Sequence, residues 1–243
     1  VIVQSPNFLG RIEPLVGFAD RIHARDPQTL LAVITNPISL GLLEPPGSFG
    51  ADIVLGEGQP LGLGLNFGGP YLGFYATREA YVRQLAGRLV GQTIDAEGKP
   101  GYVMTLTTRE QHIRRDKATS NICSNQGLMA LAATVYLSVL GKHGLRQIAE
   151  LNYHKAHYAA KAIDALPGYS VPDQNPFFNE FVVQCPCPVT KINDALLDSK
   201  PTPILGGYDL GLDFEGWTDR MLVAVTEMNS RAEIDAFVAA LAA

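Results

Sequence analysis

Charged and nucleophilic side chains are concentrated between Thr108 and Gln126, in the segment TREQHIRRDKATSNICSNQ. Its three arginines could bind a carboxylate or phosphate group through paired N–H donors. The alternative, which we favour, is a structural network of ion pairs with the neighbouring acids, Glu110 and Asp116. The segment lies between Gly-rich sequence and a long Ala/Leu run, so we expect it to mark a lined site or a subunit contact. The arginines are Arg109, Arg114 and Arg115.

Three further side chains of this segment could do chemistry of their own. His112 could act as a general acid or base near neutral pH. Lys117 could serve as an amine nucleophile, and Cys123 could have a lowered thiol pKa at a helix start. We favour the ordinary interpretations: a hydrogen-bonded network member for His112 and a buried, inert thiol for Cys123.

Metal binding is not indicated elsewhere in the chain. His154 and His157 are spaced i, i+3 and could share a metal, but no third ligand has a compatible spacing, so we expect a solvated helix face. Cys185-Pro-Cys187 is not a CxxC pair. Together with Cys123 these thiols make an odd count without framework spacing, which indicates a reducing cytoplasm.

Composition limits the class of protein. The 243 residues are 47% hydrophobic and 18% charged, which is typical of a globular protein with a sizeable core. A net charge of −5 argues against a nucleic-acid binder. No apolar run approaches the roughly 18 residues that suggest a membrane span, so we expect no membrane association. The chain begins without Met, and we interpret it as part of a longer protein whose first part is missing.

The first part of the chain alternates strands and helices. Residues 1–3, 30–34, 52–55 and 71–76 are short, mostly apolar runs next to turn residues, and we predict strands there. A helix is predicted between the first two, and a short one from Glu79 onward. The alternation favours an α/β layer with a mostly parallel sheet. The helix between the first two strands carries apolar residues at Leu9, Ile12, Leu15, Val16, Ala19 and Ile22.

The loop between Gly56 and Pro70 has six glycines and two prolines, more than an ordinary connection needs. Glycine permits close backbone approach, so such loops often line ligand sites. The loop is neither a GxGxxG motif that opens a helix nor a GxxxxGK[ST] motif, so it is weak evidence of nucleotide binding.

The later part of the chain divides into connecting helices and a small domain. A helix capped by Ser124 or Asn125 should stop at Gly141, and a second long helix should follow it. We predict helices over 189–197 and 231–241, the latter with a capping box, and strands over 181–183 and 221–225. The expected division is therefore 1–123 for the end of a large α/β domain, 124–168 for connecting helices and 169–243 for a small α+β domain.

Together these segments resemble a known family. TREQHIRR followed by KATSNIC, with VIVQSPNFLG, GADIVLGEGQPLG, NFGGPYLGFYA and GRLVG before it, is similar to the glycine cleavage system P-protein. FNEFVVQCP and LVAVTEMNSRAEIDAFVAAL extend the resemblance to the end of the chain. It is closest to the first (α-type) subunit, or N-terminal half, of that glycine dehydrogenase (decarboxylating). It implies the aspartate-aminotransferase-like (type I) fold of pyridoxal-phosphate enzymes.

The resemblance also implies that this chain lacks the catalytic lysine. In the catalytic half of the family, the strand that matches Asp52–Leu55 leads to a His-Lys pair that holds the cofactor. Gln59 and Pro60 fill that place here, and no lysine precedes Lys99. We therefore expect no catalytic residue and no covalently bound cofactor in this chain. An acid pairs with the pyridine nitrogen in related folds, but we do not assign that role to Asp52.

A partner is implied in turn. A second-type (β) subunit would supply the lysine and bind pyridoxal phosphate in an α2β2 heterotetramer. The joint reaction would decarboxylate glycine and pass the aminomethyl group to the lipoyl arm of H-protein, in a bacterial cytoplasm. On this interpretation the site or interface candidates are Arg109, Glu110, His112, Arg115, Lys117 and Asn121.

Two alternatives remain open at this point. The chain could be a purely structural or regulatory module whose degenerate site binds no ligand. It could also be an independent pyridoxal-phosphate enzyme that uses another lysine, such as Lys117. The second alternative is the poorer, because Lys117 follows the wrong element for the family.

Overall fold

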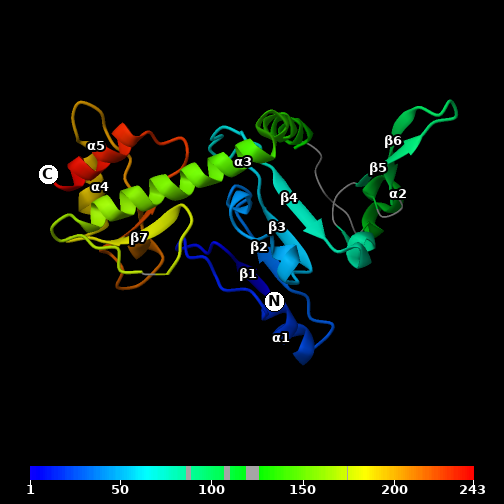
Figure 1. Ribbon diagram of the computed structural model, residues 1–243, viewed down its shortest axis with the longest axis horizontal. Coiled ribbons are helices and arrows are strands. Elements are labelled where there is room, and N and C mark those ends of the chain that lie inside the picture. The colour runs from blue at the N-terminus through cyan, green and yellow to red at the C-terminus, as the bar shows by residue number, and fades with distance from the viewer. Residues whose placement is uncertain (86–88, 107–109, 119–125, 174) are drawn as a thin grey trace.

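The structure, a computed structural model, describes residues 1–85, 89–106, 110–118, 126–173 and 175–243. A long helix runs across the molecule, with a three-stranded sheet near one end of it and a four-stranded sheet near the other (Figure 1). Short 3₁₀ helices complete the connections, at Ser39–Gly41, Pro46–Phe49, Glu79–Gln84, Arg115–Lys117 and Leu210–Leu212. The helix over 79–84 confirms the short helix predicted from Glu79.

The first sheet has four strands in the order β1-β2-β3-β4. The strands β1 (Ile2–Gln4), β2 (Ala32–Ile34) and β3 (Ile53–Glu57) are parallel, and β4 (Gly73–Thr77) is antiparallel to β3. All four predicted strands are confirmed within two residues at each end. Parallel strands place their carboxyl ends at one edge, so the loops after β1, β2 and β3 meet there.

Helix α1 (Phe18–Arg25) is shorter than predicted. The apolar spacing indicated a helix from Leu9, but the chain is irregular up to Gly17. Pro14 lies within this stretch, and Gly10 and Gly17 have left-handed φ values of 85° and 72°. The helical prediction for 9–17 was therefore wrong, because the periodic apolar residues pack from an irregular loop.

A β-hairpin that the sequence did not indicate follows β4. Strands β5 (Leu89–Ile94) and β6 (Pro100–Thr105) pair only with each other among the described residues. The hairpin extends away from the body at the right of Figure 1, with the short helix α2 (Gln111–Arg114) beside it. Its β-branched and aromatic residues, such as Val90, Ile94 and Tyr102, are a strand signal that could have been recognised.

Helix α3 (Gly127–Asp164) consists of two helices divided at Gly141, whose φ of 58° and ψ of −177° are not helical. The predicted stop at Gly141 is confirmed as this break, while Ser124 and Asn125 lie outside the described residues. By length and composition α3 is the one described helix that could cross a membrane, which the sequence did not lead us to expect. The first half, with about 14 residues at 1.5 Å each, is shorter than the roughly 30 Å of a bilayer core.

The second sheet is antiparallel, in the order β7-β9-β8. It contains β7 (Glu180–Gln184), β8 (Tyr208–Asp209) and β9 (Arg220–Ala224). One face packs on the second half of α3, α4 (Val189–Leu197) and α5 (Arg231–Leu241) through the largest apolar cluster of the molecule. The ranges of α4 and α5 match the predicted ones.

The capping box of α5 is confirmed in detail. The Ser230 hydroxyl accepts a hydrogen bond from the Glu233 amide, and the Glu233 carboxylate accepts one from the Ser230 amide at 2.6 Å. These bonds satisfy two backbone donors that a helix start leaves unpaired. The start of α5 was therefore predictable from the sequence alone.

A close backbone contact joins the loop after β1 to the second sheet. A Cβ on Gly10 would lie 1.8 Å from the carbonyl oxygen of Glu180, so only glycine fits. Beside it, Arg11 donates from Nε and Nη2 to one carboxylate oxygen of Asp173, at 2.9 and 2.6 Å. The amide of Ile12 donates to the carbonyl of Pro176 at 2.8 Å. We call this contact the domain junction.

Replacing Gly10 with alanine should destabilise the fold more than the same change at Gly17. Both glycines have left-handed φ values, but a Cβ on Gly17 would meet nothing within 4 Å. We expect a loss of about 3 kcal/mol for Gly10→Ala, from strain plus the clash, and about 1 kcal/mol for Gly17→Ala. Urea unfolding measures both, and equal losses would contradict the role of the junction.

Candidate functional site

Polar residues gather where the parallel strands end. Ser5 and Asn7 follow β1, Asn36 follows β2, and Glu57 and Gln59 lie at the end of β3. In open α/β sheets, ligands bind outside the carboxyl ends of the strands. This carboxyl edge is therefore the first place to test for a cofactor site.

The Gln59-Pro60 pair lies at this edge, half-buried in the turn after β3. The Gln59 amide side chain donates to the carbonyl of Leu63 at 2.7 Å, and its backbone N–H donates to the Glu57 carboxylate at 2.9 Å. The same carboxylate oxygen accepts from the Leu72 amide at 3.1 Å, which closes the Gly-rich loop. The Gln59 side chain of the pair that stands in place of the family's His-Lys pair thus stabilises a turn, and Pro60 beside it carries no amine.

The other polar groups of the edge are also occupied by local bonds. Asn7 donates to the Glu13 carboxylate at 2.6 Å, and Ser5 accepts from the Glu13 amide at 3.1 Å. The Asn36 side chain accepts from the Ile38 amide at 3.0 Å. A cavity of about 170 Å³ lies beside the loop after β1, next to Ser5 and Glu13. Ligand pockets are usually larger, at roughly 300–1,000 Å³.

The charges at the edge do not suit a phosphate. The charged side chains in the bonds just described are the carboxylates of Glu13 and Glu57. Arg11, the basic residue in the loop after β1, is directed at Asp173. A cofactor with a phosphate and an aldehyde needs a cation or N–H cluster and an amine. The described side chains of this edge offer neither an uncommitted cation nor an amine for such a cofactor.

The predicted site residues of the basic segment lie elsewhere. Glu110 is buried, whereas His112, Arg115 and Lys117 are exposed on α2 and the 3₁₀ turn after it. This turn lies beside the hairpin, beyond β4, which runs antiparallel to β3 and so ends at the opposite edge (Figure 1). Arg109 and Asn121 fall outside the described residues, as does Cys123.

Asp52, which was not assigned a cofactor role, has a structural environment. It is buried at the start of β3, at the edge opposite the candidate site. Its carboxylate accepts from the Leu31 amide at 2.8 Å and lies 2.9 Å from Nε2 of His23. Nε of Arg78 lies 3.4 Å from its other oxygen. The sequence did not point to this cluster, because its partners are far apart along the chain.

His157 is not on a solvated helix face, contrary to expectation. Its ring stacks on Phe177 with centroids 4.0 Å apart, and Nδ1 lies 2.8 Å from the Tyr153 carbonyl oxygen. Burial lowers the pKa of His157, the Tyr153 carbonyl partly opposes this, and the charge on His154 lowers the pKa further. His154 itself is exposed. The described residues contain no group of three or more metal-ligating side chains.

Cys185 is not a reactive centre by environment. Cys185 is buried in the small-domain core, and burial raises the pKa of its thiol to about 12. Reactive cysteines need a lowered thiol pKa. Cys187, two residues later, is partly buried and unpaired with another cysteine.

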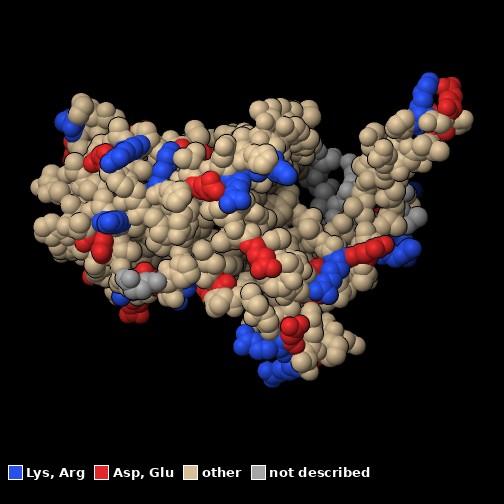
Figure 2. All heavy atoms as spheres, in the orientation of Figure 1, with Lys and Arg blue, Asp and Glu red and all other residues tan. Residues whose placement is uncertain are grey.

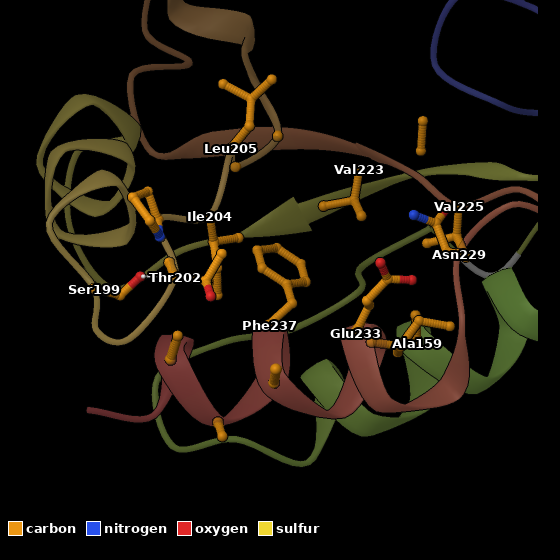
Figure 3. A pocket seen from close by; sticks show the side chains of 18 of the residues that line it. Ala159, Ser199, Thr202, Ile204, Leu205, Val223, Val225, Asn229, Glu233 and Phe237 are labelled. Atoms are coloured by element: carbon orange, nitrogen blue, oxygen red, sulfur yellow. Dashed lines mark hydrogen bonds between the residues drawn. The ribbon is translucent and has the colours of Figure 1, made fainter.

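A large, mostly apolar hollow lies beside the second sheet. It measures about 1320 Å³ and opens between α5, β9 and the segment before β8 (Figure 3). Phe237, Val223 and Ile204 project into it. Glu233 and Asn229 at its rim are already bonded to backbone amides of their own turns. This hollow is mainly an apolar surface, with the Glu180 carboxyl, whose pKa is raised by burial, also on its lining.

Comparisons with known proteins agree with this fold. A crystal structure of glycine decarboxylase (P-protein) of the glycine cleavage system, in inhibitor-bound form, superposes with a TM-score of 0.91 and 42% identity. It covers 100% of this chain, which covers 54% of that one. Alanine–glyoxylate aminotransferase from Nostoc sp. shares only the fold, with a TM-score of 0.63 and 16% identity. The fold is thus that of the type I pyridoxal-phosphate enzymes.

Sequence comparison identifies the family within this class. The model of the glycine cleavage system P-protein matches residues 1–241. A Thermomicrobium roseum protein named "probable glycine dehydrogenase (decarboxylating) subunit 1" is 58% identical over 241 residues. Those residues are 99% of this chain and 53% of the relative, so the chain spans about half the relative's length. The chain belongs to the glycine cleavage system P-protein family.

Replacing Asp52 with alanine should destabilise the fold by about 3 kcal/mol, because it leaves the Leu31 amide and two basic side chains without their buried acceptor. Asp20→Ala on exposed α1 is the control and should change little. Urea unfolding gives both values, and a loss below about 1 kcal/mol for Asp52→Ala would show that the cluster is dispensable.

The pKa of His157 predicts a pH dependence of stability. The folded-state value is lowered, so the unfolded chain binds the proton more readily. The stability that this group contributes is present above its ordinary pKa of about 6.5, and it is lost as the pH falls from that value through the lowered folded-state pKa. Between about pH 7.5 and 5.5, the urea midpoint should therefore fall less for His157→Gln than for the wild type. The exposed His143→Gln is the control, and a slope equal to wild type in His157→Gln would refute the assignment.

Proposed function

We propose that this chain is part of the non-catalytic subunit of glycine dehydrogenase (decarboxylating) in the glycine cleavage system. The supporting observation is the carboxyl edge of β1–β3, where Gln59 and Pro60 occupy the place of the family's His-Lys pair. Relatives with this chain's sequence pattern are named as subunit 1 of the enzyme. A chain without an amine at this edge cannot form the covalent link to the cofactor.

In this proposal the second-type subunit holds pyridoxal phosphate through its own lysine. The cofactor supplies the electron sink that makes decarboxylation of an amino acid feasible. This chain contributes a rigid scaffold and the exposed side chains of His112, Arg115 and Lys117 near the partner. The pair forms an α2β2 assembly in the bacterial cytoplasm and passes the aminomethyl group from glycine to the lipoyl arm of H-protein.

The lysines of this chain support the division of roles. No lysine occurs on the first sheet, because none precedes Lys99. Lys99 pairs with Glu97 at the hairpin tip at 2.6 Å, and Lys155 donates to the Glu227 carbonyl at 2.6 Å. Lys117 is exposed beside the hairpin, away from the carboxyl edge. None of these amines lies where the fold holds its cofactor.

Borohydride trapping with added pyridoxal phosphate tests the proposal. We expect a pyridoxyl-labelled peptide from the second-type subunit in the complex, and no labelled lysine in this chain, alone or in the complex. Lys117→Ala should leave the labelling unchanged. Stoichiometric labelling of a lysine in this chain would overturn the non-catalytic assignment, and labelling lost in Lys117→Ala would identify that lysine.

A further inference from the structure

The apolar hollow beside the second sheet lies where that sheet stops. Strand β8 pairs only with Met221 and Leu222 of β9, so the edge of β9 from Val223 to Val225 has no neighbouring strand among the described residues. This free edge lines the hollow of about 1320 Å³, together with Phe237 of α5 (Figure 3). Protein interiors contain few voids larger than a water molecule, whereas ligand pockets usually measure roughly 300–1,000 Å³. The hollow therefore has room for a ligand.

The Glu180 side chain lines this hollow from β7, next to the free edge. Glu180 pairs with Ala224 of β9, and side chains at paired positions of antiparallel strands lie on one face, about 5 Å apart. Ala224 is exposed, carries only a methyl group and also lines the hollow. A ligand at the free edge therefore reaches the Glu180 carboxyl group across a single methyl group.

The Glu180 carboxylate has no hydrogen bond or ion pair within the part of the chain that the structure describes, and burial alone raises its pKa. At the domain junction this residue contacts Gly10 through its main-chain carbonyl. A partly buried carboxylate without a partner costs free energy. The junction and the sheet therefore give the carboxyl group no structural task, and a bound cation would offset that cost.

The other charged groups on the described lining also favour a cation over an anion. Glu233 is ionised more readily than usual, because its hydrogen bonds with Ser230 lower its pKa. Lys200 is exposed, so its ammonium group is available to water. Figure 2 shows acidic and basic side chains interspersed over the visible face around the second sheet, with no basic patch on that face. The carboxylates of Glu180 and Glu233 therefore set the charge of the hollow.

We infer that this hollow is a binding site for a small protonated amine with an apolar body. The ammonium group would pair with the Glu180 carboxylate at the free edge, in a charge-assisted hydrogen bond. The apolar body would lie against Val223, Ile204 and Phe237, which project into the hollow (Figure 3). An extended peptide could meet the backbone of the edge, but it would leave the carboxylate without a counter-charge. The inference is independent of the assembly proposed above, because every group that it uses belongs to this chain.

Equilibrium dialysis of N,N-dimethyl-2-phenylethylamine against the full-length protein tests the inference. This tertiary amine cannot form a Schiff base with pyridoxal phosphate, so reaction with a cofactor cannot be mistaken for binding in the hollow. The control ligand is N,N-dimethyl-2-phenylacetamide, a neutral molecule of similar shape. At about pH 8, well above the ordinary pKa of a glutamate, we expect saturable binding of the amine, at least about tenfold tighter than that of the amide. Equal affinities would show an apolar surface only, and would overturn the inference.

Three variants locate the binding. Glu180→Gln removes the charge at nearly constant size and should lower the affinity for the amine to that for the amide. Ala224→Leu should also weaken amine binding, because a larger side chain covers the approach to residue 180. Glu215→Gln is the matched control, since Glu215 is exposed and does not line the hollow, and its affinity should stay within about threefold of wild type.

Urea unfolding shows whether each variant is folded, and the comparison of amine with amide on the wild-type protein needs no variant. Amine affinity retained in a folded Glu180→Gln variant would place the ligand elsewhere and overturn the inference. Absence of saturable amine binding to the wild-type protein would overturn it as well, and this is the result expected if another polypeptide segment fills the hollow.

Discussion

The break in α3 at Gly141 is the constraint on which the arrangement of the molecule depends. One continuous helix could not seat Tyr136 on the Gly-rich loop and also send Ala156 and Ile163 into the core of the second sheet. The left-handed glycine lets each half follow the surface that it covers. Both sheets are thereby tied to one polypeptide segment, and packing at its two ends, together with the domain junction, sets their relative position.

The carboxyl edge keeps the framework of the fold, with its described polar side chains bonded locally. The parallel strands still bring three loops together, but the polar groups there bond to neighbouring backbone and to one another. A cofactor enzyme must leave such groups free for its ligand, at a cost in stability. Here the Glu57 carboxylate instead closes the loop between Gln59 and Leu72. The edge has the bonding of a structural turn.

Local signals made much of the fold predictable. The capping box of α5, the range of α4 and the strand runs could be read from neighbouring residues. The helix over 9–17 could have been rejected from Pro14 and Gly17, but the apolar spacing was given more weight. The cluster of His23, Asp52 and Arg78 could not be predicted, because it depends on tertiary contacts between separate elements. The Gln59-Pro60 position was found by resemblance, whereas its bonding required coordinates.

The domain junction distributes mutational tolerance unevenly between its two sides. Gly10 approaches the main-chain carbonyl of residue 180, an atom that every amino acid carries. The side chain at 180 can therefore vary without altering the contact, whereas the residue at 10 has a single permitted identity. Sequence drift at this contact should accordingly be one-sided, with an invariant glycine facing a strand residue whose side chain the contact does not constrain.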